Sequence, residues 1–426
     1  MAETTRGGGS SSPSIERPTV FIPDAWAEKA DAIAYDAETY PPPVTLICGA
    51  KNTGKSTFSR HLLNTLLTRY KRVAYLETDL GQPEFTAPGC LSLHVIDKPT
   101  PDLTILCVKT PERCIFYGDV SSKRDPKTYL NNIFSLYDYF RMQYRSSRSE
   151  ISRKAMLPLV INTPGWIKGT GYDMLVEMLR YVVPTHVVKI RITVDSKNLP
   201  PGAFWLDKNE EVQVNVIDID AARQDSSNRS VLVRKDARLM RDLRLIAYFR
   251  QCFPSDMNIM TYKELAHALA SLPPYQVPIS AVKVMHLHCK VPNDENFHSL
   301  NATIVGLAMN YGKSADSEPC VPWCFGLGIV RSIDVSNGLL YIITPVPRCS
   351  LEKVDLLLQG FIEIPTCLLQ VSGCLSPYMS TNVMHRIEAP DMNAQPRCQS
   401  HAVKFMPELS TSFYSSILLK SVVKKG

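Results

Sequence analysis

Long hydrophobic runs are missing from this sequence. None of its apolar stretches approaches the roughly 18 residues that a membrane-spanning helix requires. The N-terminal segment MAETTRGGGSSSPSIERP also lacks the apolar core of a secretory signal peptide. We therefore expect an intracellular, soluble protein that does not associate with membranes.

Cysteine pairs at metal-ligand spacing are nearly absent. The twelve cysteines are scattered, and three of them, Cys48, Cys107 and Cys367, lie inside apolar runs. Cys320 and Cys324 form one C-x-x-x-C pair, but no second pair completes a zinc site. Reduced thiols in the core are the simpler interpretation for a chain without a signal peptide.

A strong charge imbalance is missing as well. The 47 basic and 41 acidic residues give a net charge of +6, which permits a nucleic-acid partner but does not indicate one. The chain has 426 residues, of which 45% are hydrophobic and 21% are charged. That length suits two domains, and the composition supplies a core for each of them.

What is present is an alternation of apolar strands and amphipathic helices. Because apolar strands separated by helices favour a parallel sheet covered on both faces, we predict an α/β fold with a doubly wound, mostly parallel sheet. The predicted strands cover 44–48, 72–78, 103–108, 158–163 and 185–190, and the predicted helices cover 56–70, 129–144 and 172–183.

The pattern changes after about residue 255. A proline-punctuated link, PPYQVPIS, precedes closely spaced apolar runs, and Asn337-Gly338 is a hairpin-turn signal between two of them. The predicted strands cover 281–289, 301–309, 325–335, 339–345 and 361–369. We predict a short N-terminal segment at 1–40, disordered over its Gly/Ser-rich first 17 residues, a P-loop domain at 41–255, and a smaller, β-rich, antiparallel domain at 256–426.

A phosphate-binding loop follows the first predicted strand. Residues 49–56 read GAKNTGKS, which matches the G-x-x-x-x-G-K-S pattern, with a predicted helix directly after it. Gly49 and Gly54 allow the tight turn that aims backbone N–H groups at phosphate oxygens. Lys55 is placed to reach the β- and γ-phosphates, and Ser56 to ligate Mg²⁺. Nucleotide binding is therefore the first functional expectation.

Two carboxylates follow the next strand, in LETDLGQPEF. Glu77 and Asp79 are spaced i, i+2, so a continuing strand would place them on one face. One of them is expected to orient Mg²⁺ and the other to accept a proton from an attacking hydroxyl. Gly81 permits a sharp exit, and Gln82 offers an amide to phosphate or sugar. Carboxylates that merely solvate a strand end are the alternative.

A third strand ends in NTPGWIKGTGYDML. Thr163, Gly165, Trp166 and Lys168 combine a hydroxyl, a flexible backbone, an aromatic ring and an ammonium group, which suits a polynucleotide. The alternative is that Trp166 is a core anchor. The segment also resembles the D-x-x-G switch of GTPases, but Asn162 stands at the Asp position and no N-K-x-D motif follows.

An arginine stripe lies in LVRKDARLMRDLRLIAYF. Arg234, Arg238 and Arg241 follow helical spacing, and Arg244 continues it. Such a stripe would suit a lid that covers a phosphoryl group during transfer. A solvated basic helix face is the alternative.

Together these motifs resemble the polynucleotide 5′-hydroxyl kinases. The likeness is carried by GAKNTGKST, LETDLGQPEF, FYGDVSSKRDPKTYL, INTPGWIKGTGYDML and the arginine-rich segment before AYF, in that order. The C-terminal motifs PPYQVPIS, FGLGIVRSID and YIITPVP look like the nucleolar branch of this family, which acts in ribosomal RNA processing. The resemblance covers about residues 40 to 370.

The resemblance implies an ATP- and Mg²⁺-dependent kinase acting on RNA with a 5′-hydroxyl end. Asp79 would be the general base near Mg²⁺, residues 163–168 a clasp on the substrate, and Arg241, with Arg238 or Arg244, the lid arginine. The Walker A loop would comprise Gly49, Ala50, Lys51, Asn52, Thr53, Gly54, Lys55, Ser56 and Thr57. The family's usual partner is a pre-rRNA endoribonuclease, expected on the C-terminal domain, in the nucleolus of the nucleus.

Two other functional classes remain open from the residues alone. One is a switch or assembly ATPase or GTPase that hydrolyses nucleotide without phosphorylating RNA. The other is an inactive scaffold that keeps the P-loop to bind nucleotide and acts through its C-terminal domain.

Overall fold

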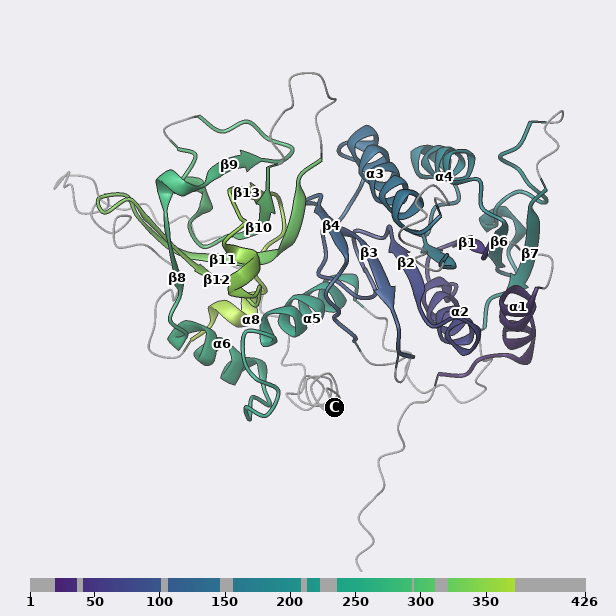
Figure 1. Ribbon diagram of the computed structural model, residues 1–426, viewed down its shortest axis with the longest axis horizontal. Helices are drawn as coiled ribbons and strands as arrows, with labels where there is room; N and C mark the ends of the chain where they lie inside the picture. Colours follow the sequence, from purple (N-terminus) through teal and green to yellow (C-terminus); the bar gives the residue numbers. More distant parts are fainter. Residues whose placement is uncertain are drawn as a thin grey trace, which may run out of the picture.

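The chain folds around two β-sheets that lie side by side (Figure 1). The computed structural model describes residues 20–36, 41–100, 106–145, 156–207, 213–222, 236–292, 295–310 and 321–371. Four sequence-based interpretations lie outside these ranges, namely the disorder of residues 1–17, the placement of Arg234 and Cys320, and the C-terminal tail.

The first sheet has seven strands in the order β4-β3-β2-β5-β1-β6-β7. The central pairs β2–β5, β5–β1, β1–β6 and β6–β7 are parallel, and β3 and β4 add an antiparallel edge. The strands are β1 Val44–Gly49, β2 Val73–Glu77, β3 Cys90–Ile96, β4 Arg113–Phe116, β5 Leu159–Asn162, β6 His186–Arg191 and β7 Asn215–Asp220. The predicted mostly parallel sheet is confirmed.

Helices cover both faces of this sheet (Figure 1). Alternate residues of β1 point to opposite faces, so Leu46 packs with α3 and α4, whereas Ile47 packs with α1 and α2. These helices are α1 Asp24–Tyr35, α2 Lys55–Arg69, α3 Pro126–Tyr144 and α4 Gly169–Val182. The doubly wound arrangement is therefore confirmed.

Several local predictions for this half of the chain were wrong or incomplete. A strand was predicted at 103–108, but the described part, 106–108, forms none. The antiparallel strands β3 and β4 and the edge strand β7 were not predicted. Residues 24–35 were assigned to the short N-terminal segment, but they form α1. Their alanine-rich sequence favours a helix, and burial of Trp26 (2% exposed) stabilises it through tertiary contacts.

The second sheet has six strands in the order β8-β12-β11-β10-β13-β9. All pairs are antiparallel except β13–β9, which is parallel. The strands are β8 Tyr275–Pro278, β9 Lys283–His286, β10 Ile304–Met309, β11 Trp323–Asp334, β12 Leu339–Ile343 and β13 Leu356–Gln359. The predicted hairpin at Asn337-Gly338 is confirmed, because β11 pairs with β12 across it and Gly338 has a φ of 64°.

Corrections apply here as well. The link at 273–280 contains β8, an edge strand, where proline is tolerated. The strand predicted at 361–369 is not formed; β13 precedes it and Thr366–Leu369 is the short helix α8. The remaining elements are α5 Ala237–Arg250, α6 Tyr262–Ser271 and α7 Arg348–Leu351, with 3₁₀ turns at Asp195–Lys197, Ile279–Ala281 and His298–Leu300.

A shared apolar cluster joins the two sheets. Phe116 of β4 packs with Phe249 of α5 and with Leu327 of β11. A Cβ atom at Gly306 of β10 would lie 2.7 Å from the Phe116 ring, so the glycine permits the close packing. Helix α5 therefore lies in the seam between the sheets. Among the described residues, no helix combines the length and apolar character needed to cross a membrane.

Candidate active site

Three functional segments lie side by side at one edge of the first sheet. The P-loop follows β1, the acidic turn (residues 77–84) follows β2, and the clasp (residues 163–168) follows β5. Because β5 lies between β2 and β1 and all three strands are parallel, their carboxyl ends meet at the same edge. This is where ligands collect in doubly wound sheets.

The P-loop backbone depends on its two glycines. Gly49 has a φ of 144° and Gly54 a φ of 95°, which L side chains rarely adopt. A Cβ atom at Gly49 would also lie 2.5 Å from the Ile190 carbonyl oxygen, and one at Gly54 would lie 2.6 Å from the ring of Trp26. Helix α1, which was not predicted, thus packs against the P-loop through the ring of Trp26.

Lys55 begins helix α2 and is buried beneath the P-loop. Its Nζ atom donates a hydrogen bond of 2.7 Å to the Ala50 carbonyl oxygen. Burial lowers the pKa of Lys55 to about 8, and the nearby negative charge of Asp79 acts in the opposite direction. The ammonium group is therefore enclosed by the loop whose N–H groups are aimed at phosphate.

Glu77 is the buried centre of the acidic turn, with no exposed surface. Its Oε1 accepts the Asp79 N–H at 2.9 Å, and its Oε2 accepts the Glu84 N–H at 2.9 Å. Burial, followed by the charge of Asp79, raises the pKa of Glu77 to about 8, while those N–H donors oppose the rise. Glu77 closes the turn and does not face a ligand.

Asp79 is half-buried and differently arranged. Its Oδ1 accepts the N–H groups of Gly81 at 2.9 Å and of Gln82 at 3.1 Å. Within the described part of the chain, Oδ2 forms no hydrogen bond. The prediction that the two carboxylates share one face of a continuing strand was wrong, because β2 ends at Glu77. Of the two, only Asp79 has an oxygen left for a ligand.

Asn162 links the P-loop to the acidic turn. Its Nδ2 lies 3.2 Å from the Ser56 Oγ and 3.1 Å from Oε1 of Glu77. From the sequence, Asn162 is only a departure from a GTPase motif, and this linking role was not predicted. Its position at the end of the strand between the two segments is the signal that identifies it.

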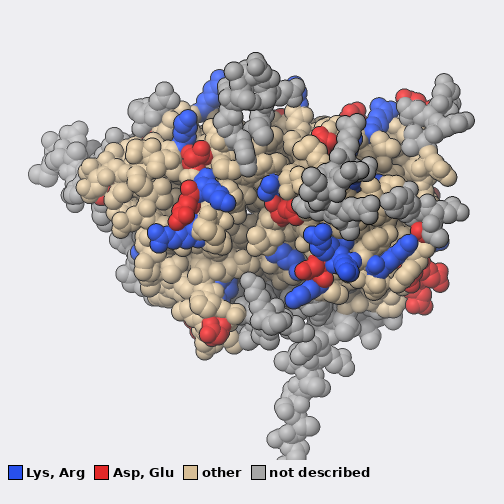
Figure 2. Space-filling model, in the orientation of Figure 1, with Lys and Arg blue, Asp and Glu red and all other residues tan. Residues whose placement is uncertain are grey.

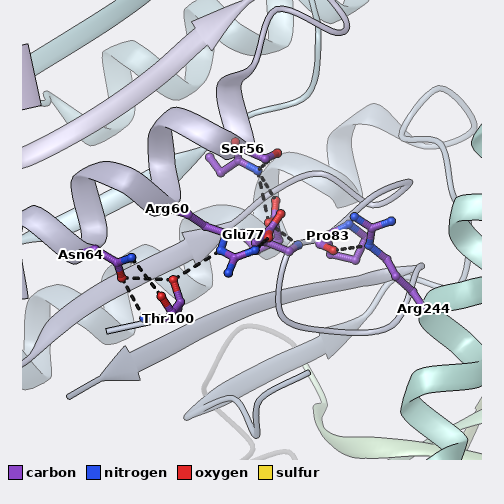
Figure 3. A network of polar contacts seen from close by, with 9 residues as sticks. Ser56, Arg60, Asn64, Glu77, Pro83, Thr100 and Arg244 are labelled. Carbon is purple, nitrogen blue, oxygen red and sulfur yellow. Dashed lines mark hydrogen bonds and ion pairs between the residues drawn. The ribbon is translucent and has the colours of Figure 1, made fainter. Parts of the chain in front are cut away.

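Two buried arginines hold the outer part of the acidic turn (Figure 3). Arg60 of α2 forms an ion pair of 2.8 Å with Glu84, and its side chain is 1% exposed. Arg244 of α5 donates from Nε to the Pro83 carbonyl oxygen at 2.7 Å. Burial lowers the pKa of Arg244, and the carboxylates of Glu84, Glu77 and Asp79 oppose this. The turn is therefore fixed from both sides.

The clasp residues have different environments. Thr163 is 1% exposed, and its hydroxyl donates to the Ile47 carbonyl oxygen at 2.7 Å, so it anchors the clasp and does not face a ligand. A Cβ atom at Gly165 would lie 2.7 Å from the Lys51 backbone nitrogen, which brings the clasp directly against the P-loop. Lys168 is exposed, at the start of α4.

Trp166 is half-buried and packs against the apolar core of the first sheet, while part of its surface remains exposed. Its ring lies 5.4 Å from the Tyr129 ring in an edge-to-face arrangement. Tyr129 donates its hydroxyl to the Thr78 carbonyl oxygen at 2.6 Å, and this contact connects the clasp to the acidic turn. The Gln82 side chain is also half-buried on that turn.

The three lid arginines also differ. Arg238 is exposed, 3.9 Å from the Glu363 carboxylate, and Arg244 is committed to Pro83. Arg241 is half-buried and lines a cavity of about 250 Å³ between α5 and residues 361–366. Among the described residues, no hydrogen bond or ion pair engages its guanidinium group. Arg241 is therefore the one of the three that is free to bind an anion.

The oxygen donors of the site suit Mg²⁺. In the described ranges no three His, Cys, Asp or Glu side chains form a metal cage. Mg²⁺ does not need one, because it is commonly held by one or two protein oxygens together with phosphates and waters. The Ser56 hydroxyl and the free oxygen of Asp79 are hard ligands of this kind.

The cysteine pair noted in the sequence gives no sign of a metal site at its described member. Cys324 is a buried thiol that donates to the Gly326 carbonyl oxygen.

Comparison with known proteins assigns the two halves separately. Residues 49–251 match the family described as mRNA cleavage and polyadenylation factor CLP1 P-loop. Residues 270–365 match the family described as NOL9-like, C-terminal domain. Clp1p in its complex with Pcf11p has a similar fold, with a TM-score of 0.56 at 15% identity over 80% of this chain and 79% of that chain.

Whole-chain relatives are more specific. The polynucleotide 5′-hydroxyl-kinase NOL9 of Arabidopsis thaliana is 56% identical over 87% of this chain and 98% of its own length. The human protein of the same name is 30% identical over 80% of this chain and 52% of its own length, so this chain spans about half of it. The chain belongs to the NOL9 family of polynucleotide 5′-hydroxyl-kinases.

Proposed function

We propose that this protein transfers the γ-phosphoryl group of ATP to the 5′-hydroxyl end of RNA. The observation that supports this best is the linked P-loop and acidic turn, in which Asp79 keeps one free oxygen beside the phosphate-binding loop. A hydrolase would need only a positioned water there, whereas the exposed Lys168 at the end of the clasp offers a cation to a polynucleotide acceptor.

In this proposal each residue has one task. The P-loop N–H groups and Lys55 bind the phosphates, and Asp79 orients the 5′-hydroxyl and accepts its proton. Arg241 approaches the transferred group, and Trp166 and Lys168 hold the RNA end. Bound through Ser56 and Asp79, Mg²⁺ would neutralise charge on the phosphates.

We also propose a specific RNA substrate, a cellular location and a protein partner. Membership of the NOL9 family supports a pre-rRNA processing intermediate as substrate and the nucleolus as location. We propose that an endoribonuclease leaving a 5′-hydroxyl end docks on the second sheet. Exposed apolar side chains there, Tyr275, Met285 and Val335, offer contact surface to such a partner.

The three functional classes predict different products. We expect γ-labelled ATP and a 5′-hydroxyl RNA oligonucleotide to give labelled RNA, and Lys55→Ala to abolish the label. Free labelled phosphate without labelled RNA would contradict the kinase and favour an ATPase. Neither product, with ATP binding retained, would favour the scaffold.

ATP affinity should depend on pH through Lys55. Its pKa is about 8, and only the ammonium form attracts phosphate. We expect a constant Kd for ATP below that pH and a rise of up to about tenfold per pH unit above it, until the pKa of Lys55 in the complex is reached. Isothermal titration between about pH 7 and 10 measures this directly.

Lys55→Arg is the matched control, because the guanidinium group stays charged over the same range. Its Kd should change little with pH, even if the affinity is weaker. An equally steep rise in Lys55→Arg would assign the pH dependence to another group.

A further inference from the structure

The segment FYGDVSSKRDP has no role in the proposed chemistry, yet it connects the active site to the second sheet. We call residues 117–124 the seam loop. The Val120 carbonyl oxygen lies 3.2 Å from where a Cβ atom of Gly81 would be, on the acidic turn. Two residues earlier in the seam loop, the Gly118 carbonyl oxygen accepts the Phe361 N–H at 2.6 Å. The seam loop therefore contacts both the acidic turn and Phe361.

Glycines make this contact possible. Gly118 has a φ of 79°, and a Cβ atom on Gly360 would collide with the Gly118 carbonyl oxygen. The backbones of the two halves therefore touch directly at this point. Phe361, which follows β13 of the second sheet, is therefore tied to the loop that contacts the acidic turn carrying Asp79.

Phe361 is partly exposed at the seam, with the Arg124 guanidinium group over its ring. Its side chain is 45% exposed, which is unusual for a phenylalanine fixed by its own backbone. The Arg124 guanidinium carbon lies 4.4 Å from the ring centroid, and the His288 ring lies 6.2 Å away at an angle of 19°. Asp119 holds Arg124 through an ion pair of 2.9 Å. An aromatic ring beside a held cation is the arrangement that binds unpaired bases and their phosphates.

The Phe361 ring also lines the cavity that Arg238 and Arg241 border. Phe361, Val120, Arg238, Arg241, Asp242 and Glu363 all contribute to this space of about 250 Å³. Two arginines and two carboxylates line the cavity: Arg238 lies near Glu363, and the charges of Arg238 and Arg241 act on Asp242, but within the described ranges no hydrogen bond or ion pair engages the Arg241 guanidinium group. The cavity thus joins Arg241 to the partly exposed ring of Phe361, and Val120 borders both this cavity and the acidic turn.

We propose that this cavity binds the nucleotides that follow the 5′ end of single-stranded RNA, with a base stacked on Phe361 and a backbone phosphate near Arg241 and Arg124. This inference rests on the proposed substrate, an RNA 5′ end. It assigns the second sheet, through residues 360–366, a direct part in the substrate site. This binding mode would also give a role to the charged residues Asp119, Lys123 and Arg124 of the seam loop, which contacts the acidic turn.

The charge distribution supports a short contact. On the face shown in Figure 2, basic side chains occur in separate groups interspersed with acidic ones, on both halves and between them. Among the described side chains on that face, no unbroken basic track of the kind that binds a long polynucleotide runs across both halves. Stacking at Phe361 should therefore contribute a large share of the affinity.

Direct binding tests this without requiring turnover. The probe is a 5′-hydroxyl, single-stranded RNA of about ten nucleotides with a 3′ fluorophore, measured by anisotropy on the full chain. Because stacking on one base accounts for about 5- to 150-fold in affinity, Phe361→Ala and Phe361→Leu should each raise the Kd by about tenfold. Phe361→Tyr should stay within about twofold, because it keeps the ring. Met257→Ala, a control at an equally exposed apolar side chain with no assigned role, should change nothing.

The outcomes separate this inference from the proposed function. Unchanged RNA affinity in both Phe361→Ala and Phe361→Leu, or no RNA binding by the unaltered protein, would overturn the inference. RNA binding that depends on Phe361 without any phosphorylation would support it and contradict the kinase. Phosphorylation with affinity independent of Phe361 would do the reverse. ATP affinity in the Phe361 variants should equal that of the parent, which excludes a folding defect.

Discussion

Replacing Asp79 by asparagine is expected to lower kcat for RNA phosphorylation by about 100- to 10,000-fold, the usual contribution of a general base. The asparagine keeps an oxygen at the position of Oδ1, which accepts the N–H groups of Gly81 and Gln82, so the acidic turn should keep its shape. Initial rates with saturating ATP and 5′-hydroxyl RNA measure the effect.

The control is Asp256→Asn, which makes the same chemical change at an exposed site. Its kcat should match that of the parent protein. If Asp79→Asn kept more than about a tenth of the parent rate, another group would have to accept the proton, since general bases contribute far more than that. Glu77 would then be the first candidate to reconsider.

Glu77→Ala is expected to lower the free energy of unfolding by about 2–5 kcal/mol, because it leaves three donors without an acceptor. These donors are the N–H groups of Asp79 and Glu84 and the side-chain amide of Asn162. The rate of phosphorylation should fall as well, since the turn that carries Asp79 loses its central support. Urea unfolding followed by circular dichroism measures the stability.

Glu77→Gln has the shape of the neutral acid and keeps one acceptor oxygen, so its loss of stability should be smaller. Glu177→Ala removes an exposed carboxylate from α4 and should stay within about 0.5 kcal/mol of the parent. Equal stability of Glu77→Ala and Glu177→Ala would show that water replaces the lost contacts and that Glu77 is not the centre of the turn.

The P-loop and the meeting of three segments at one sheet edge could be predicted from the sequence. The P-loop is a local pattern, since Gly49, Gly54 and Lys55 fix it within a few residues. The edge follows from a general rule, because carboxyl ends of parallel strands share one side of a sheet. Neither inference requires knowing which side chains touch.

What escaped prediction depends on contacts between distant residues. Trp26 packs on Gly54 from helix α1, and Asn162 acts through neighbours on helix α2 and strand β2. Thr163 looked available for a ligand, but its hydroxyl bonds to Ile47 of the adjacent strand. Phe361 lies more than two hundred positions after the P-loop and reaches the site through backbone packing. The spacing of residues along the chain does not indicate which distant residues come into contact.

The most direct measurement compares two RNA oligonucleotides of identical sequence, one with a 5′-hydroxyl and one with a 5′-phosphate end. Each is incubated with γ-labelled ATP and this protein, and the position of the label is read after complete digestion to mononucleotides. The account predicts label on the 5′ nucleotide of the hydroxyl oligonucleotide alone, lost in Asp79→Asn. Label on both oligonucleotides, or on neither while ATP is consumed, would contradict it.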